Sequence, residues 1–162
     1  MKTVAKWLAA AALLVVTAGG VQAQDVELPT QGTTEINLSG NIFFGDGSSW
    51  SAQGMWAPFV SPNLQWGFFA SLFDGPSQDT SGTIGVLANW HFVPNSGATL
   101  PYVGVGFGFG FGDNNDNIWN IHAGIKHFLT SQVAFFAELQ MVDGGGFDND
   151  LMLMFGLSIF RR

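Results

Sequence analysis

The stretch Gly104–Gly112 reads G-V-G-F-G-F-G-F-G and alternates glycine with a bulky apolar residue throughout. Successive side chains of a β-strand point to opposite faces, so this alternation predicts a strand with one apolar face and one bare face. In a water-soluble sandwich the bulky face would pack inward and leave bare backbone toward water. In a membrane barrel the bulky face would contact lipid, and the glycines would face a crowded lumen. The rest of the sequence decides between these two folds.

The composition restricts the chain to one apolar domain. Its 162 residues suffice for a single domain, and 47% of them are hydrophobic whereas only 10% are charged. The low charge and the 16 phenylalanines argue against a disordered chain. The net charge of −7 argues against a nucleic-acid-binding protein, because phosphate backbones are bound by Lys and Arg. The chain has no cysteine, which excludes disulfides and thiolate metal sites.

The N-terminal segment has the pattern of a secretory signal peptide. Lys2 and Lys6 give it a positive start, residues 7–16 form a short apolar core, and Ala23 is the small residue expected before a cleavage site. The core is shorter than the roughly 20 residues that a transmembrane helix requires. We therefore predict a cleaved signal peptide at 1–23, with a retained amphipathic anchor as the alternative. No later apolar run reaches spanning length, so a mature chain in a membrane would span it as a barrel.

Residues 24–33 are polar and predict a short periplasmic tail before a barrel domain at 34–162. Eight segments of about ten residues follow, which is the length of a tilted membrane strand. They cover 34–44, 50–59, 64–73, 82–92, 100–111, 118–128, 133–142 and 151–160. Turn-forming residues separate them at hairpin length. The pattern predicts the all-β class, as an eight-stranded antiparallel up-and-down transmembrane β-barrel.

Alternate positions of each segment separate an apolar face from a face of mixed polarity. In 34–44, for example, Ile36 and Leu38 alternate with Glu35 and Asn37. Five tryptophans lie on the apolar face close to segment ends: Trp50, Trp56, Trp66, Trp90 and Trp119. Indole rings concentrate at the membrane–water boundary, so their placement predicts two aromatic girdles. This favours lipid outside the barrel, with the glycines of Gly104–Gly112 facing the lumen.

Three later segments resemble a known family. They read L-P-Y-V-G-V-G at 100–106, H-A-G-I-K-H-F-L-T at 122–130 and A-E-L at 137–139. In this order they are similar to the OmpA/OmpX-like family of small outer-membrane β-barrel proteins. The closing G-L-S-I-F at 156–160 resembles the strand read by the outer-membrane assembly machinery, although the chain ends on two arginines rather than on an aromatic residue. The resemblance implies a barrel in the outer membrane and specifies no activity.

Five titratable residues are expected to point into the lumen: Glu35, His91, His122, Lys126 and Glu138. In a tight hairpin of 118–128 with 133–142, positions 122, 124 and 126 should lie opposite about 140, 138 and 136. Glu138 would then be within reach of Lys126 and His122, as a structural pair. Neither His122 nor His127 belongs to the His-x-Ser motif of lipid A deacylases. We predict no catalytic, cofactor-binding or metal-ligating residues and no cofactor.

The bore of an eight-stranded barrel is narrow enough for side chains to fill it. The expected fillers are Gln53, Met55, Phe69, Phe73, Leu87, Tyr102, Phe128, Phe136, Met152 and Met154. The sequence therefore predicts a non-enzymatic outer-membrane protein with a structural or surface-exposed role. The alternative is a narrow channel or a carrier for small apolar molecules, since the glycines remove side-chain volume from one wall. Adhesion or host-factor binding and lipid A modification are less favoured.

The expected partners are outer-membrane lipid, lipopolysaccharide and, during biogenesis, the outer-membrane assembly machinery. We expect a monomer that binds no nucleic acid. The tail and the turns with little charge are expected in the periplasm. The Asp/Gly-rich loops near 45–47, 74–76, 113–116 and 143–146 are expected outside the cell.

Overall fold

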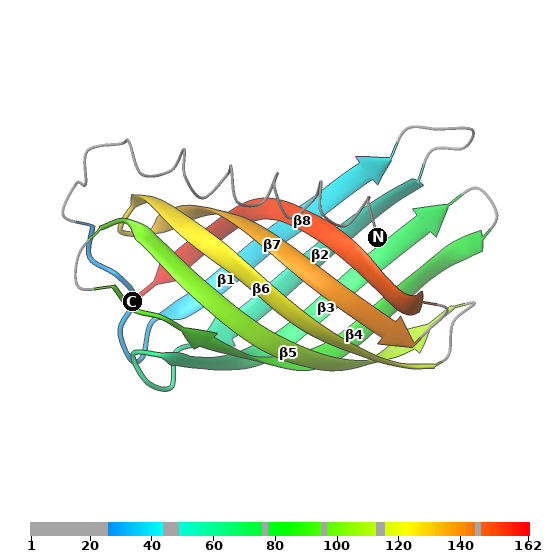
Figure 1. Cartoon of the computed structure of the whole chain (residues 1–162), viewed down its shortest axis with the longest axis horizontal. Coiled ribbons are helices and arrows are strands. Elements are labelled where there is room, and N and C mark those ends of the chain that lie inside the picture. The colour runs from blue at the N-terminus through cyan, green and yellow to red at the C-terminus, as the bar shows by residue number, and fades with distance from the viewer. Residues whose placement is uncertain (1–25, 44–48, 76–77, 95–96, 113–115, 145–146) are drawn as a thin grey trace, which may run out of the picture.

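The computed structural model is a closed barrel of eight antiparallel strands (Figure 1). It describes residues 26–43, 49–75, 78–94, 97–112, 116–144 and 147–162. The strands are β1 (Thr34–Phe43), β2 (Ser49–Pro58), β3 (Leu64–Gly75), β4 (Gln78–His91), β5 (Thr99–Phe111), β6 (Asn117–Thr130), β7 (Val133–Gly144) and β8 (Phe147–Arg161). Each strand pairs with its sequence neighbours, and β8 pairs with β1 to close the sheet. This confirms the predicted up-and-down barrel.

The predicted signal peptide at 1–23 lies outside the described residues. The predicted tail is described from Val26 onward, and up to Thr33 it contains neither strand nor helix. Within the described residues, no helix is long and apolar enough to cross a membrane.

Two strands start four residues earlier than the apolar alternation predicts. β4 and β8 begin at Gln78 and Phe147 rather than at 82 and 151. Their ladders begin with Gly75 opposite Gln78 and with Gly144 opposite Phe147. Pairing extends this far because a ladder needs only backbone N–H and C=O groups, whereas the prediction followed the side chains.

The barrel has an apolar outer face and a lumen filled by side chains. All five predicted girdle tryptophans lie on the outer face, with exposed fractions between 38% and 49%. The bulky residues of β5 from Val103 to Phe111 are exposed on the same face, while the residues between them are mostly buried. Every strand contributes at least one large exposed apolar side chain to this surface. The predicted assignment of faces is therefore confirmed.

The two ends of the barrel differ in what they hold. The terminal end contains the start of β1, the end of β8 and the connections at 59–63, 92–98 and 131–132. The loop end contains the ends of β1, β3, β5 and β7 and the starts of β2, β4, β6 and β8. In Figure 1 the terminal end is on the left, where the C-terminus is marked.

The glycines of β5 follow the prediction except at the last position. Gly104, Gly106 and Gly108 are buried on the lumen side, and Gly110 is half-buried there. Gly112 was expected to face the lumen, but β5 ends at Phe111 and Gly112 lies in the next connection with a φ of +89°. Glycine adopts this left-handed conformation without the strain that a β-carbon adds. The last glycine thus ends the strand.

An apolar cluster closes the lumen at the terminal end. Its buried members are Phe59, Leu100, Phe128, Ala134 and Phe160, against which Val26, Leu28 and Ala98 pack. The tail is held to the barrel at two further points. The N–H of Gly32 donates to the carbonyl of Phe59 at 2.9 Å, and Arg162 forms an ion pair with Glu27. The tail therefore forms part of the closure.

The seam between β1 and β8 runs from the pair Thr34–Arg161 to the pair Ser39–Gly156. On its other edge β1 pairs with β2 over its whole length, from Thr34 to Phe43. The other seven ladders join consecutive strands as hairpins, whereas the seam joins the two ends of the barrel domain.

Replacing Phe160 by alanine should destabilise the barrel far more than the same change at Phe155. Both residues lie on β8, but Phe160 is 2% exposed in the terminal-end cluster and Phe155 is 37% exposed on the outer face. A Phe→Ala change in a packed core costs about 3–5 kcal/mol, because it removes contacts and leaves a cavity. Urea unfolding in detergent micelles measures both losses. Equal losses would contradict a packed closure at this end.

Candidate functional site in the barrel lumen

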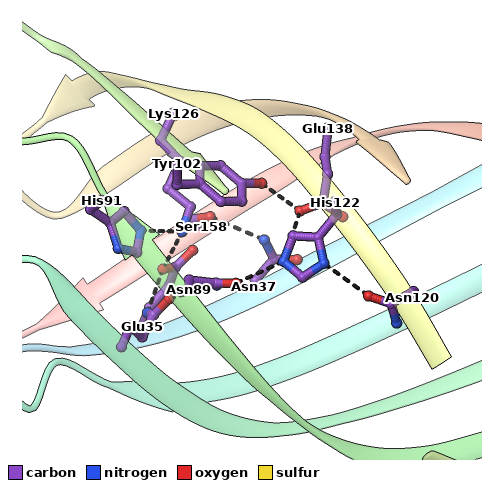
Figure 2. A network of polar contacts seen from close by, with 11 residues as sticks. Glu35, Asn37, Asn89, His91, Tyr102, Asn120, His122, Lys126, Glu138 and Ser158 are labelled. Atoms are coloured by element: carbon purple, nitrogen blue, oxygen red, sulfur yellow. Dashed lines mark hydrogen bonds and ion pairs between the residues drawn. The ribbon is translucent and has the colours of Figure 1, made fainter. Parts of the chain in front are cut away.

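The lumen holds a cluster of buried polar side chains, drawn in Figure 2. All five titratable residues predicted to point inward do so: Glu35, His91, His122, Lys126 and Glu138. Glu35 and His91 are 0% exposed and Lys126 is 1% exposed. Burying groups of this kind is costly unless they find partners, so their contacts decide what the site does.

The predicted register of β6 and β7 is confirmed, but the predicted partner of Lys126 is wrong. Glu138 lies opposite Gly124, as expected. The ammonium Nζ of Lys126 nevertheless lies 2.7 Å from Oε2 of Glu35 on β1. Tyr102 separates it from Glu138, because the Tyr102 ring centroid lies 4.4 Å from Nζ and the Tyr102 hydroxyl donates to Glu138 at 2.7 Å. Hairpin register alone does not reveal the barrel closure that brings β1 within reach of β6.

The Lys126–Glu35 pair is fully enclosed. Removing two charges from water costs several kcal/mol per ion, which their attraction offsets only when further hydrogen bonds are made. Oε2 of Glu35 also accepts from Nε2 of Gln65 at 2.7 Å, and Nζ of Lys126 lies 3.3 Å from Nε2 of His91. Within the described part of the chain, Oε1 of Glu35 and Nδ1 of His91 are buried without a protein hydrogen-bond partner. Ordered water commonly satisfies such atoms.

A directed chain of side-chain hydrogen bonds leads from Glu35 to His122. A carboxylate only accepts, so the group of Gln65 that faces Glu35 is its NH₂. The oxygen of Gln65 then faces Asn89, whose Nδ2 donates to it at 2.9 Å. The oxygen of Asn89 lies 2.7 Å from Nε2 of His122, which therefore carries a ring hydrogen. The charge of Glu35 thus fixes two amide orientations and one histidine proton.

His122 extends this chain along its own strand β6 and to the neighbouring strand β7. Its Nδ1 lies 2.9 Å from the side chain of Asn120, and its Nε2 lies 4.0 Å from Oε2 of Glu138. A separate bond runs from Nδ2 of Asn37 to the hydroxyl of Ser158 at 3.3 Å. Together with this separate bond, the network takes side chains from β1, β3, β4, β5, β6, β7 and β8. It therefore joins the walls of the barrel to one another.

The glycines of β5 provide the space for this network. A β-carbon added at Gly104 would collide with Oδ1 of Asn89 and Nε2 of His122, which lie within hydrogen-bond distance of each other. One added at Gly106 would lie 2.6 Å from Nδ2 of Asn120. The bare face of β5 thus receives the polar side chains of its two neighbours, β4 and β6.

Two small cavities remain in the lumen. The volume within which the centre of a water molecule fits is about 20 Å³ in one cavity and about 80 Å³ in the other. The smaller one lies within the polar network, between Tyr102, His122 and Glu138. The lining of the larger cavity includes apolar side chains such as Phe69 and Met152. One water needs about 10–15 Å³ on this measure, so the first cavity fits about one water molecule and the second fits a few.

The network can hold charge and order water, but it does not have the form of a nucleophilic centre. Acyl transfer needs a hydroxyl or thiol beside a base, and Ser158, the serine of the network, bonds to Asn37 rather than to a histidine. Across the described residues there is no group of three or more His, Asp or Glu side chains that could hold a metal ion. Sequence reasoning missed Gln65, although its position between the outward Leu64 and Trp66 gives the inward parity.

Breaking the ion pair from one side should destabilise the barrel more than removing both charges. Glu35→Gln leaves the buried ammonium without its counter-ion, and Lys126→Met strands the carboxylate, so each should cost about 3–5 kcal/mol. The double variant should recover much of the loss. Unfolding free energies in micelles give the coupling as a double-mutant cycle. Strictly additive losses would contradict a direct pair.

Gly104→Ala should disturb the network, whereas Gly54→Ala should not. The added methyl at Gly104 separates Asn89 from His122, while at Gly54 the nearest atom is Cδ2 of Leu38 at 3.7 Å. We expect a loss of about 1–3 kcal/mol for Gly104→Ala, as for other overpacked sites. The ring signals of His122 in ¹⁵N-histidine-labelled protein report on the local effect. Unchanged His122 signals in Gly104→Ala would contradict the conclusion that Gly104 provides the space for the contact between Asn89 and His122.

No family model matches the sequence, and no curated protein matches it. The structure is similar to the N-terminal β-barrel domain of Pseudomonas aeruginosa OprF, with a TM-score of 0.63 and 16% identity over 82% of this chain and 100% of that one. Neisserial surface protein A matches with a TM-score of 0.56 and 16% identity over 78% and 93%. A de novo designed transmembrane β-barrel matches with a TM-score of 0.60 and 18% identity over 83% and 100%. The chain therefore has the fold of small eight-stranded outer-membrane barrels.

Proposed function

We propose that the protein is a non-enzymatic integral outer-membrane β-barrel with a largely filled lumen and a structural or surface-exposed role. The observation that carries this proposal is the inverted polarity of the barrel. Large apolar side chains are exposed around its outer face, whereas Glu35, His91 and Lys126 are buried inside. An exposed apolar surface of this extent is unfavourable in water, and it matches the hydrocarbon of a bilayer.

We place the terminal end in the periplasm and the loop end outside the cell. The tail and the C-terminus meet at the terminal end, which is where a chain that enters from the periplasm keeps its ends in an even-stranded barrel. The loop end carries the half-buried Asp74 and Asp143 and the exposed Asp150, whose carboxylates suit the polar side of the membrane boundary.

The partners implied by this proposal are outer-membrane lipid and lipopolysaccharide around the barrel, and the assembly machinery during insertion. The closed sheet supports a monomer, because the first and last strands pair with each other, from Thr34–Arg161 to Ser39–Gly156, rather than with another chain. The amphipathic end of β8, with Leu157 and Ile159 exposed outward, is the segment that we expect the machinery to bind.

A narrow channel or carrier for small apolar molecules is the second candidate, and the larger cavity of about 80 Å³ favours it. A benzene-sized ligand occupies a cavity of about 150 Å³, so this cavity is too small for such a molecule without rearrangement. The terminal-end cluster also blocks passage toward the periplasmic side. Adhesion ranks lower because two of the loop-end connections, at 76–77 and 145–146, are only two residues long.

The full-length protein should fractionate with the outer membrane when it is expressed in a Gram-negative host. On a denaturing gel the unheated sample should migrate differently from the heated sample, because a closed barrel stays folded in detergent until it is heated. Recovery as a soluble periplasmic protein without this heat-dependent shift would overturn the proposal.

Permeability of liposomes that contain the folded protein separates the filled barrel from an open channel. A filled barrel should leave the entry rate of a small sugar or amino acid at the level of protein-free liposomes. Solute entry that increases with the amount of inserted protein would favour the channel instead.

A further inference from the structure

The hairpins β2–β3 and β6–β7 are structural repeats offset by 69 residues. Trp56 lies opposite Phe68, and the residues 69 positions later, Ile125 and Ala137, also lie opposite each other. The next ladder repeats as well, because the register shift within 73–75 recurs within 142–144.

The turns of the two hairpins repeat in the same way. The hydroxyls of Ser61 and Thr130, again 69 positions apart, each accept the N–H of the residue three positions later, at 3.0 and 3.1 Å. Each strand of one hairpin lies four positions along the strand order from its equivalent in the other, as β2 does from β6. In a closed barrel of eight strands the two hairpins therefore lie on opposite sides.

Few residues are identical between the two hairpins. In 50–75 compared with 119–144 the identical positions are Trp50/Trp119, Phe59/Phe128, Asp74/Asp143 and Gly75/Gly144. The phenylalanines both belong to the terminal-end cluster, and the glycines both lie at the register shift. The other two identical positions hold a tryptophan and an aspartate that are hydrogen-bonded to each other within each hairpin.

Each half joins its tryptophan to its aspartate in the same manner. Nε1 of Trp50 donates to Oδ2 of Asp74 at 3.2 Å, and Nε1 of Trp119 donates to Oδ2 of Asp143 at 2.9 Å. The partners lie directly opposite in the ladders. The two rings are exposed to the same extent, 39% and 38%, on the outer face at the loop end. The same contact therefore recurs at equivalent positions of the two hairpins.

The chemistry of these pairs matches a boundary between hydrocarbon and water. An ionised carboxylate on the outer face is unfavourable within the hydrocarbon, whereas an indole ring is favourable at its edge. On β3, Asp74 lies eight residues from Trp66 of the opposite girdle. That is about 26 Å along a strand, and about 20 Å along the axis for a tilt of about 40°. Allowing for the size of the rings, this spacing is close to the apolar band of about 25 Å found in such barrels.

We propose that Trp50–Asp74 and Trp119–Asp143 are two lipid-boundary contacts on opposite sides of the barrel. In each contact the ring lies at the edge of the hydrocarbon and the carboxylate lies in the headgroup layer of the outward-facing leaflet. Two contacts on opposite sides limit both the height of the barrel and its tilt. The inference rests on the proposed membrane-spanning function and adds the lipid headgroup boundary as the partner of this surface.

The test uses Trp119 as the only tryptophan, with the others replaced by Phe, in phosphatidylcholine liposomes brominated at a shallow or a deep acyl position. Quenching should be stronger with shallow bromines. Asp143→Leu should lower the ratio of shallow to deep quenching at least twofold, because the ring loses its polar partner and sinks. The control Asp150→Leu removes a loop-end carboxylate from the lumen-facing side of β8, opposite the buried Val142, and should leave the ratio unchanged.

A second reporter repeats the test on the opposite side, with Trp50 as the only tryptophan and Asp74→Leu as the change. Heat-modifiable migration confirms the folding of each variant. If the variant of one Trp–Asp contact does not fold, the variant of the other contact provides the test. An unchanged ratio in the folded variant, or an equal change in Asp150→Leu, would overturn the inference. A protein with Trp66 alone separates this failure from that of the proposed function. If bromines at neither depth quench Trp66, the barrel does not span the bilayer.

Discussion

The structure depends on closing eight strands around a bore that side chains alone can fill. Closure pairs the edges of the sheet and turns alternate residues of every strand into a narrow common space. Polar groups from non-neighbouring strands must then satisfy one another, which is why Lys126 pairs with Glu35 across the lumen. The same constraint explains the bare face of β5, because the side chains of Asn89 and His122 occupy the volume beside Gly104.

Local patterns predict most of this fold, because side-chain direction alternates strictly along a strand. Their positions in this alternation place Trp50 and Trp119 outside the barrel. In the same way, Glu35 and His122 are placed inside it. Strand ends were predicted less well, since β8 starts at Phe147 where the backbone, and not the side chains, defines the ladder. The partner of Lys126 was wrong for a different reason. It depends on contacts across the lumen, which hairpin register does not contain.

The lumen network resembles a structural core built from polar groups. A single ionised group, Glu35, sets the direction of the hydrogen bonds through Gln65 and Asn89 to His122. Such a core tolerates few exchanges, because reversing one amide would leave two acceptors or two donors facing each other. The similarity to the OprF domain, at 16% identity, concerns the fold.

The seam between β1 and β8 gives the barrel an order of assembly. Seven ladders close short loops, whereas the seam must bring Thr34 to Arg161 and so closes a loop as long as the whole domain. Long loops lose more chain entropy on closure, and non-local pairing is slow. The hairpins can therefore form early, while the seam completes the cylinder last. The ion pair of Glu27 with Arg162 then ties the segment before β1 to the residue that follows β8, beside the closed seam.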